Sequence, residues 1–232
     1  MTDPEQTRVT DYYRQRDKHP PVQYDPLSQW VARTVKHRDL ALANALRRAE
    51  LGNIESLRGL EIGCGSGGNL LFLLRLGFRP EHLTGNDIMG ERIGQARRRL
   101  PPTVRLLTGN ADRLDLESGS IQVVLQSLVF SSIMDGNTTA RVRDEIWRVL
   151  APGGGLLWYD LRFGNPGNPN VRGIRLREIR QLFPQAKVTA WSTTLAPPLS
   201  RAVCRLAGPL YEAFNLLPFL RSHLVCWIAK PE

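Results

Sequence analysis

Hydrophobic and polar positions along the chain fall into blocks that predict strands and helices in turn. Short apolar runs predict strands, because a sheet covered on both faces hides nearly every side chain of its strands. These runs lie at about residues 57–63, 82–87, 104–109, 121–127, 153–159, 187–195 and 223–230. Segments with helical spacing of apolar residues lie between them, at 68–76, 90–100, 138–150 and 174–183. The helix at 138–150 is expected to start at a cap formed by Asn137 or Thr138. The alternation predicts an α/β fold.

Both ends of the chain depart from this alternation. At the amino end a polar stretch precedes an amphipathic helix predicted for 27–51, which Gly52 ends. Towards the carboxyl end, 162–173 is a loop rich in Gly, Pro and Asn, and 196–221 is an apolar segment broken by prolines. We therefore divide the chain into an N-terminal arm and helix over 1–52 that forms a lid or cap, a ligand-binding core over 53–162, and a C-terminal completion of the sheet over 163–232 with a substrate-side cap at 196–221.

The first predicted strand ends in a glycine-rich turn, LEIGCGSGG, which leads directly into the helix at 68–76. Glycine has no Cβ, so the main chain can turn sharply there and come close to a ligand. The start of the helix offers free N–H groups to a polar or anionic ligand. This combination predicts a nucleotide-binding corner at the carboxyl edge of a doubly wound sheet.

Two acidic residues narrow the choice of nucleotide. Glu61 lies two residues before Gly63, and Asp87 ends the next predicted strand, where a carboxylate can accept both ribose hydroxyls. The spacing Gly63-x-Gly65-x-x-Gly68 also fits a dinucleotide, so an NAD(P)-dependent oxidoreductase remains an alternative. That class usually carries an apolar residue in place of Glu61. A ligand with a cationic ammonium group and no pyrophosphate, such as S-adenosylmethionine, favours an acid there.

Four motifs in this order resemble those of class I S-adenosylmethionine-dependent methyltransferases, including the type 11-like members. The segment 61–67 is similar to their first motif, and Asp87 is similar to the acid at the end of their second strand. Residues 109–116, GNADRLDL, resemble their third element, and residues 145–160, EIWRVLAPGGGLLWYD, resemble their helix–turn–strand segment around P-G-G. Several motifs in the right order are more specific than any one of them.

The resemblance implies a fold, a cofactor and a set of site residues. The implied fold is a doubly wound, Rossmann-like seven-stranded sheet in the order 3-2-1-4-5-7-6, with strand seven antiparallel. The implied cofactor is S-adenosylmethionine, held by the glycine turn, the ends of the next strands and the N-terminal arm. The implied residues are Glu61, Gly63, Cys64, Gly65, Gly67, Asp87, Ile88, Asn110, Ala111, Asp112, Gln126, Tyr12 and Tyr13. For the two tyrosines, packing of the arm against the core is the alternative.

Candidate catalytic groups are fewer than candidate cofactor groups. Methyl transfer is an in-line displacement, so alignment of acceptor and methyl group supplies much of the rate, and only a weakly acidic acceptor needs a general base. Asp160, at the end of strand five, is the best-placed carboxylate, and its alternative role is to organise the adjoining loop. Gln126 and Ser127 are expected near the reacting sulfur. His19 lies in the N-terminal arm, where a solvated loop histidine is the alternative.

The amino-acid composition indicates a folded domain and argues against disulfide-rich, zinc-binding and membrane-spanning proteins. A chain of 232 residues that is 42% hydrophobic has enough apolar residues for one folded domain with a core. Its three cysteines, Cys64, Cys204 and Cys226, give neither a disulfide framework nor a zinc site, so no metal is expected. The chain shows no signal peptide and no apolar run long enough to span a membrane, and we expect it to be cytoplasmic.

The net charge of +9 leaves several partners open. Residues 151–232 hold ten Lys and Arg against four Asp and Glu, so most of the excess lies there. A basic surface fits nucleic acid, an anionic membrane or a phosphorylated substrate, and genome composition is the plainer explanation. A nucleic-acid methyltransferase is an alternative that the sequence disfavours, because the D/N-P-P-[FYW] signature and an RNA-binding module are missing.

The segment 196–221 is expected to bound the acceptor pocket. It is too apolar for a free loop and too broken by proline for one long helix, which predicts short helices over the carboxyl edge of the sheet, near the 162–173 loop. Simple packing on the core, a dimer face and a peripheral membrane contact are the alternatives. Together these features predict methyl transfer to a small-molecule, glycan or lipid-linked acceptor.

Overall fold

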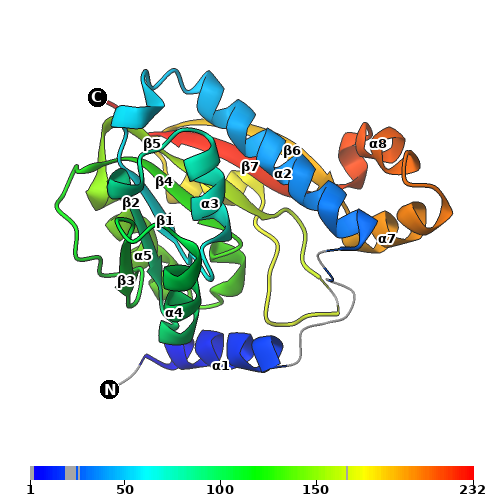
Figure 1. Ribbon diagram of the computed structural model, residues 1–232, viewed down its shortest axis with the longest axis horizontal. Helices are drawn as coiled ribbons and strands as arrows, with labels where there is room; N and C mark the ends of the chain where they lie inside the picture. Colours follow the sequence, from blue (N-terminus) through cyan, green and yellow to red (C-terminus); the bar gives the residue numbers. More distant parts are fainter. Residues whose placement is uncertain (1–2, 19–24, 26, 166) are drawn as a thin grey trace.

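A seven-stranded sheet in the order β3-β2-β1-β4-β5-β7-β6 forms the centre of the molecule (Figure 1). The computed structural model describes residues 3–18, 25, 27–165 and 167–232. The neighbouring pairs among β1 to β5 are parallel, and β7 pairs antiparallel with both β5 and β6. The sheet order and the antiparallel seventh strand that the motifs imply are therefore confirmed.

Strands and helices follow one another along the chain as the apolar pattern predicts. The strands are β1 (Gly59–Ile62), β2 (Leu83–Asp87), β3 (Arg105–Thr108), β4 (Ile121–Ser127), β5 (Leu150–Leu161), β6 (Lys187–Leu195) and β7 (Arg221–Ala229). The helices are α1 (Pro4–Lys18), α2 (Gln29–Arg48), α3 (Gly68–Arg75), α4 (Gly90–Arg99), α5 (Gly136–Val149), α6 (Leu176–Leu182), α7 (Pro197–Leu206) and α8 (Leu210–Asn215). Two short 3₁₀ helices also enter the argument, η4 (Phe130–Ser132) and η5 (Pro218–Leu220).

Helices cover both faces of the sheet, because alternate residues of each strand point to opposite faces. On one face α2, α3 and α4 pack around buried residues such as Leu42, Leu73 and Leu125 (Figure 1). On the other face α5 and α6 pack around residues such as Ile146 and Trp158. The two cores fix the strand ends at the edges of the sheet, where the site lies.

The start of α5 differs from the sequence prediction. The helix begins at Gly136, and the side chain of Asp135 caps it by accepting a hydrogen bond from the Thr138 N–H at 2.6 Å. Neither Asn137 nor Thr138 is therefore the cap, because both lie within the first turn. The α2 helix also lies inside its predicted range, since it spans Gln29–Arg48.

Two regions lie outside the layers of sheet and helices. The first is α1, a helix without buried residues that crosses the molecule beyond α4, where the sequence suggested only a polar arm (Figure 1). The second is the C-terminal lobe, residues 196–221, in which α7, α8 and η5 project beside α2 and β6 (Figure 1). The prediction of short helices over 196–221 is confirmed. None of the described helices is both long and apolar enough to cross a membrane.

Candidate functional site

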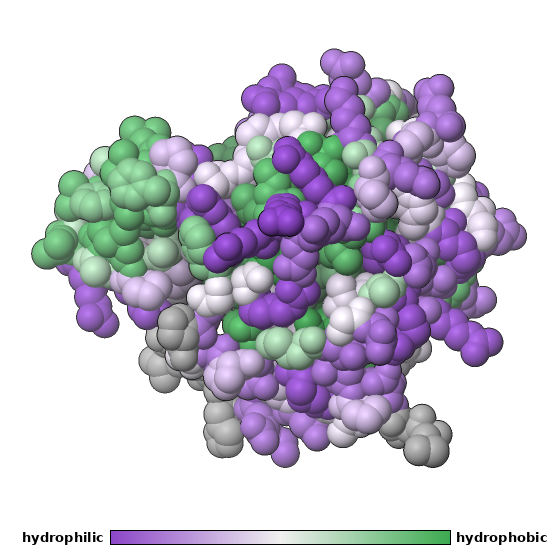
Figure 2. Space-filling view, turned by 180° about the vertical axis from the view of Figure 1, so that it is seen from behind, coloured by the Kyte–Doolittle hydropathy of each residue, from purple (hydrophilic) through white to green (hydrophobic). Residues whose placement is uncertain are grey.

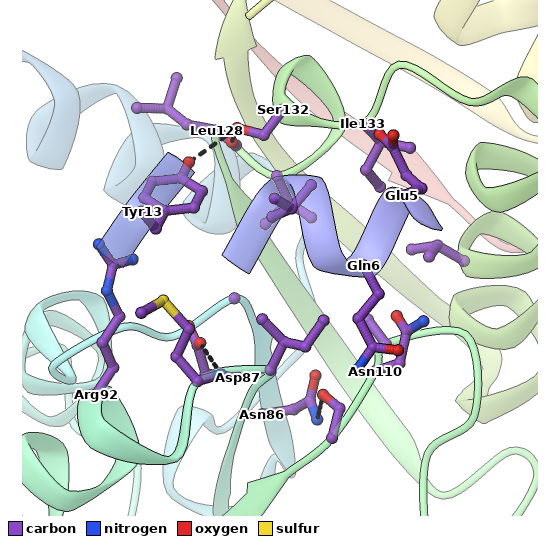
Figure 3. Close-up of a pocket in the computed structure, with 18 of the residues that line it drawn as sticks. Glu5, Gln6, Tyr13, Asn86, Asp87, Arg92, Asn110, Leu128, Ser132 and Ile133 are labelled. Carbon is purple, nitrogen blue, oxygen red and sulfur yellow. Dashed lines mark hydrogen bonds between the residues drawn. The ribbon is translucent and has the colours of Figure 1, made fainter. Parts of the chain in front are cut away.

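A cavity of about 310 Å³ lies between α1 and the carboxyl ends of β1, β2 and β4 (Figure 3). Open α/β sheets place their ligands at this edge, and the volume is in the range of small-molecule sites. One wall consists of the residues at and after the strand ends, which are Gly63, 86–89, 109–111 and 127–129. The opposite wall consists of α1.

The glycine turn after β1 depends on backbone conformations that favour glycine. Gly63, Gly65 and Gly67 have φ angles of +63°, +53° and +84°. A Cβ on Gly63 would lie 2.6 Å from Cγ2 of Val129, so a side chain there would force the turn and the segment after β4 apart. Gly63 lines the cavity, whereas Gly65 and Gly67 shape the turn behind it, with Gly67 as the N-cap residue of α3.

Asp87 is buried at the end of β2, lines the cavity and holds the glycine turn in place. One carboxylate oxygen accepts a hydrogen bond from the Gly65 N–H and the other from the Met89 N–H, both at 2.8 Å. A carboxylate has about four acceptor positions. Each oxygen of Asp87 can therefore accept a further hydrogen bond, as a ribose diol would require.

Glu61 is buried beneath the glycine turn, on the face of the sheet that α3 covers. Its Oε1 accepts a hydrogen bond from Nδ2 of Asn69 at 2.7 Å, while its Oε2 has no partner within the described part of the chain. Burial disfavours the charged form and raises the pKa of Glu61 to about 8. Glu61 does not line the cavity. A cationic ligand group near Gly63 would favour the ionised form of this side chain, whereas a pyrophosphate would disfavour it.

The loop after β3 presents Asn110 and Ala111 to the cavity, and Ile88 lines it from the end of β2. These three residues therefore lie together, as the resemblance implies. Asn86 fixes this loop, because its Nδ2 donates a hydrogen bond to the Gly109 carbonyl at 3.0 Å. Asp112 is not brought into the cavity wall. Its carboxylate accepts a hydrogen bond from Nε of Arg141 at 3.1 Å instead.

The backbone after β4 is strained where it borders the cavity. Leu128 has a φ of +61° although it is not glycine, a conformation that costs about 1–3 kcal/mol and concentrates at functional sites. The surrounding structure holds it there. The Leu128 N–H donates to the Tyr159 carbonyl at 2.9 Å, and the Leu128 carbonyl accepts from Oγ of Ser132 at 3.0 Å. Ser127, expected near the reacting group, lines the cavity here.

Gln126 and Asp160 lie behind this strained turn, and neither is among the lining residues. Oε1 of Gln126 accepts a hydrogen bond from the Val129 N–H at 3.1 Å. The Asp160 carboxylate accepts hydrogen bonds from the N–H groups of Ser131, at 3.1 Å, and Leu161, at 2.8 Å. Burial raises the pKa of Asp160 to about 6. This geometry favours the loop-organising role for Asp160 over a catalytic one.

The wall formed by α1 directs Tyr13 at the cavity (Figure 3). The Tyr13 hydroxyl lies 2.8 Å from Oγ of Ser132, within hydrogen-bond distance. The guanidinium of Arg92, on α4, lies 4.4 Å from the centre of the Tyr13 ring and also pairs with Asp17 at 2.8 Å. These contacts connect α1 to both α4 and η4.

The remaining predicted residues lie elsewhere. The Tyr12 hydroxyl accepts a hydrogen bond from Nδ2 of Asn168 at 2.8 Å and does not line the cavity. Cys64 is buried in the core, where burial raises the pKa of its thiol. His19 lies outside the residues that the structure describes.

Most residues of the α1 wall, including Glu5 and Asp17, are not among the predicted site residues. The helix has no apolar stripe, so periodicity gave no signal. A start signal was nevertheless present. Asp3 accepts a hydrogen bond from the Glu5 N–H at 2.9 Å, and Pro4 occupies the first helical position, which is a favourable N-terminus.

The C-terminal lobe does not contribute to this cavity among the described lining residues. Arg172, in the 162–173 loop, contacts the end of η4. Its Nε donates a hydrogen bond to the Ile133 carbonyl at 3.2 Å, and its guanidinium forms an ion pair with Glu178 at 2.5 Å. Arg162 connects the 162–173 loop to the lobe by donating to the Pro218 carbonyl at 3.2 Å. A role of the lobe in binding the acceptor stays a prediction.

Comparisons with known proteins agree with this architecture. Residues 60–154 match the family described as methyltransferase domain. The phthiotriol/phenolphthiotriol dimycocerosates methyltransferase 1 of Mycobacterium ulcerans is 34% identical over 147 residues, which are 61% of this chain and 52% of that protein. The fatty-acid O-methyltransferase of Mycolicibacterium smegmatis is 35% identical over 115 residues, 49% of this chain and 40% of that protein. The chain thus spans about half the length, or less, of these relatives.

The fold has counterparts among solved structures. A crystal structure of an S-adenosylmethionine-dependent methyltransferase from Mesorhizobium loti superposes with a TM-score of 0.58 at 17% identity, covering 82% of this chain and 98% of that one. At this identity the likeness concerns the fold. The matched domain over residues 60–154, the ordered motifs and the sheet order agree with one another, and this part of the chain is similar to methyltransferase domains.

Proposed function

We propose that this chain transfers the methyl group of S-adenosylmethionine to a lipid-like acceptor. The observation that carries the proposal is the cavity at the carboxyl ends of β1, β2 and β4, which lies largely within the matched methyltransferase domain. When bound, the cofactor supplies a methyl group activated on a cationic sulfur. A ligand that carries positive charge would favour the ionised form of Glu61, whose Oε2 has no partner among the described residues.

The residues of the strand-end wall have separate tasks in this proposal. Asp87 accepts hydrogen bonds from the ribose hydroxyls, because its two oxygens are fixed by backbone N–H groups and keep acceptor capacity. Asn110 and Ala111 border the adenine. The backbone at Gly63 approaches the methionine part, since no side chain obstructs it there. Tyr13 closes the cavity from the other side.

Two observations support a lipid-like acceptor. The first is the apolar character of much of the cavity wall, to which Val9, Val129, Ile133 and Val142 contribute. The second is that the matched relatives are named as methyltransferases of phthiotriol dimycocerosates and of fatty acids. A carboxylic acid acceptor is already ionised near neutral pH and needs no general base. Positioning alone then supplies the catalysis that the chain contributes.

The test is a transfer assay with S-adenosylmethionine labelled in its methyl group. The acceptors are a long-chain fatty acid, a neutral oligosaccharide and transfer RNA, each with the wild-type chain and with Asp87→Ala as control. We expect label in the fatty-acid ester with the wild type only. Label in the oligosaccharide or the RNA, and none in the lipid, would overturn the acceptor class. Failure to bind the cofactor at all would overturn the methyltransferase activity.

A further inference from the structure

The C-terminal lobe turns an almost wholly apolar surface outward. Every exposed residue within 202–219 is apolar except Arg205. The largest exposures are those of Leu206 (80%), Leu216 (74%) and Phe219 (69%). Figure 2 shows this surface as a hydrophobic lobe at one end of the molecule. Contiguous apolar surfaces of this kind mark contacts with a partner or a membrane.

The inner side of the lobe, by contrast, is tied to α2 by polar groups. Glu212 of α8 lies 2.6 Å from Nε2 of His37 and 2.9 Å from Nη1 of Arg33. Nδ2 of Asn215 lies 3.1 Å from Nδ1 of His37, and Tyr211, fully buried, stacks on the same imidazole. The lobe is therefore anchored in one orientation. These polar contacts and a small buried apolar cluster that includes Leu195, Val203 and Tyr211 hold its inner side, while further large apolar side chains remain exposed on the outside.

We propose that the C-terminal lobe inserts its apolar side chains into the headgroup region of an anionic lipid bilayer. Charge complementarity favours this occupant. The chain carries a net charge of +9, and Arg205 and Arg201 lie on the lobe. Basic residues beside an apolar surface are attracted to anionic lipids. Two copies of the chain would repel each other, because each carries a net charge of +9. The lobe also projects from the rest of the molecule, a shape that suits insertion into a bilayer better than contact between two flat protein surfaces (Figure 1).

The lobe lies at the edge of the sheet that also carries the cavity. β6 runs parallel to β5, because both are antiparallel to β7, so α7 follows the same carboxyl edge. Arg162 links η5 to the 162–173 loop, and Asn168 in that loop bonds to Tyr12 of α1. A bilayer bound by the lobe would therefore face the edge where the cavity lies. The proposal is argued from the lobe itself and holds for any acceptor.

The experiment is cosedimentation with vesicles of phosphatidylcholine alone and of phosphatidylcholine mixed with phosphatidylglycerol. The lobe variant is the double substitution Leu216→Ser and Phe219→Ser. The control is Leu40→Ser, which removes a side chain 51% exposed on α2, outside the lobe. Arg205→Gln tests the charge. Calorimetric titration with S-adenosylmethionine checks that each variant is folded, and sedimentation velocity records the oligomeric state without lipid.

We expect the wild type and Leu40→Ser to bind the vesicles that contain phosphatidylglycerol. The partition coefficient should fall about ten-fold or more in the double variant, which loses two large apolar groups, and about five-fold in Arg205→Gln. High salt should weaken binding. The proposal is overturned if the wild type does not bind vesicles that contain phosphatidylglycerol, or if the double variant binds them as strongly as the wild type does. If the wild type does not bind vesicles but forms a dimer that the double substitution disrupts, the surface contacts a second copy of the chain, and the proposal is overturned as well. Because the vesicle assay needs no methyl transfer, an inactive chain that binds vesicles contradicts only the proposed function.

Discussion

The cavity has two walls that are held in different ways. The strand-end wall is part of the core: Asp87 is buried, and backbone N–H groups fix both of its carboxylate oxygens. The α1 wall has no buried residue and is held by polar side-chain contacts, such as those of Tyr13 with Ser132 and of Arg92 with Asp17. Displacing α1 exposes little apolar surface, so it costs far less than disturbing the strand ends. We therefore propose that the strand-end wall recognises the ligand and that α1 acts as a lid over it.

The largest effect should follow from breaking the strand-end wall at Asp87. Asp87→Ala removes the candidate acceptor for the ribose and leaves the N–H groups of Gly65 and Met89 without their partner. We expect cofactor affinity to fall about ten- to hundred-fold and the free energy of unfolding to fall by about 1–3 kcal/mol. Calorimetry and urea denaturation measure the two effects. Asp112→Ala is the matched control, because its carboxylate pairs with Arg141, and it should keep full affinity. Unchanged affinity in a folded Asp87→Ala chain would remove Asp87 from the site.

The second prediction concerns Glu61 and pH. Its pKa is raised by burial from 4.5 to about 8, so within this window the folded chain keeps a proton that the unfolded chain has released. The free energy of unfolding should therefore fall as pH rises, by on the order of 2 kcal/mol between about pH 6.5 and 8, a range above the pKa of Asp160. Glu61→Gln should remove this slope. Denaturation at the two pH values measures it, and a slope that survives the substitution would assign the titration to another group.

Removal of α1 should show how loosely the second wall is held. Deleting residues 1–18 should lower the free energy of unfolding by only about 1–2 kcal/mol, because the helix buries no residue and is held by polar contacts such as that of Tyr13 with Ser132. Dissociation of the cofactor should become about ten-fold faster, since the cavity loses one wall. Stopped-flow displacement measures the rate. A deletion that unfolds the chain would show that α1 belongs to the core and would erase the contrast between the two walls.

The smallest effect is expected from one hydrogen bond of α1. Tyr13→Phe removes the contact with Ser132, worth about 0.5–1.5 kcal/mol, so cofactor affinity should fall by about two- to ten-fold. Tyr12→Phe, which loses its bond to Asn168 outside the cavity, should leave the affinity unchanged. Equal losses in both variants would mean that α1 acts through its overall docking and not through Tyr13.

Much of the fold could be predicted from the sequence, because apolar runs indicate the strands and the ordered motifs imply the order of the strands in the sheet. The predicted runs at 121–127 and 187–195 coincide with β4 and β6, and the motif order implied the crossover that places β7 between its neighbours. The α1 helix was missed because polar side-chain contacts, not an apolar stripe, hold it. The α5 cap, Asp135, lies two or three residues before the predicted positions, because its side chain accepts a hydrogen bond from the Thr138 N–H.

The sequence predicts which segments lie near the cavity, but it does not predict which of their side chains point into it. Ile88, Asn110 and Ala111 line the cavity, whereas Asp112 and Gln126 do not. Motif spacing brings these residues to the same edge of the sheet. It does not reveal that Asp112 pairs with Arg141, or that Gln126 turns back to hold the Val129 N–H, because both partners come from other parts of the fold.

The identity of the ligand that enters the cavity decides the function of the chain most directly. One calorimetric series, titrating the wild-type chain with S-adenosylmethionine, S-adenosylhomocysteine, NAD and NADP, decides this. We predict micromolar binding of the two sulfur ligands and no heat of binding with the two dinucleotides, because Glu61 lies beneath the turn in place of an apolar residue. Tight binding of NADP with no response to either sulfur ligand would contradict the account.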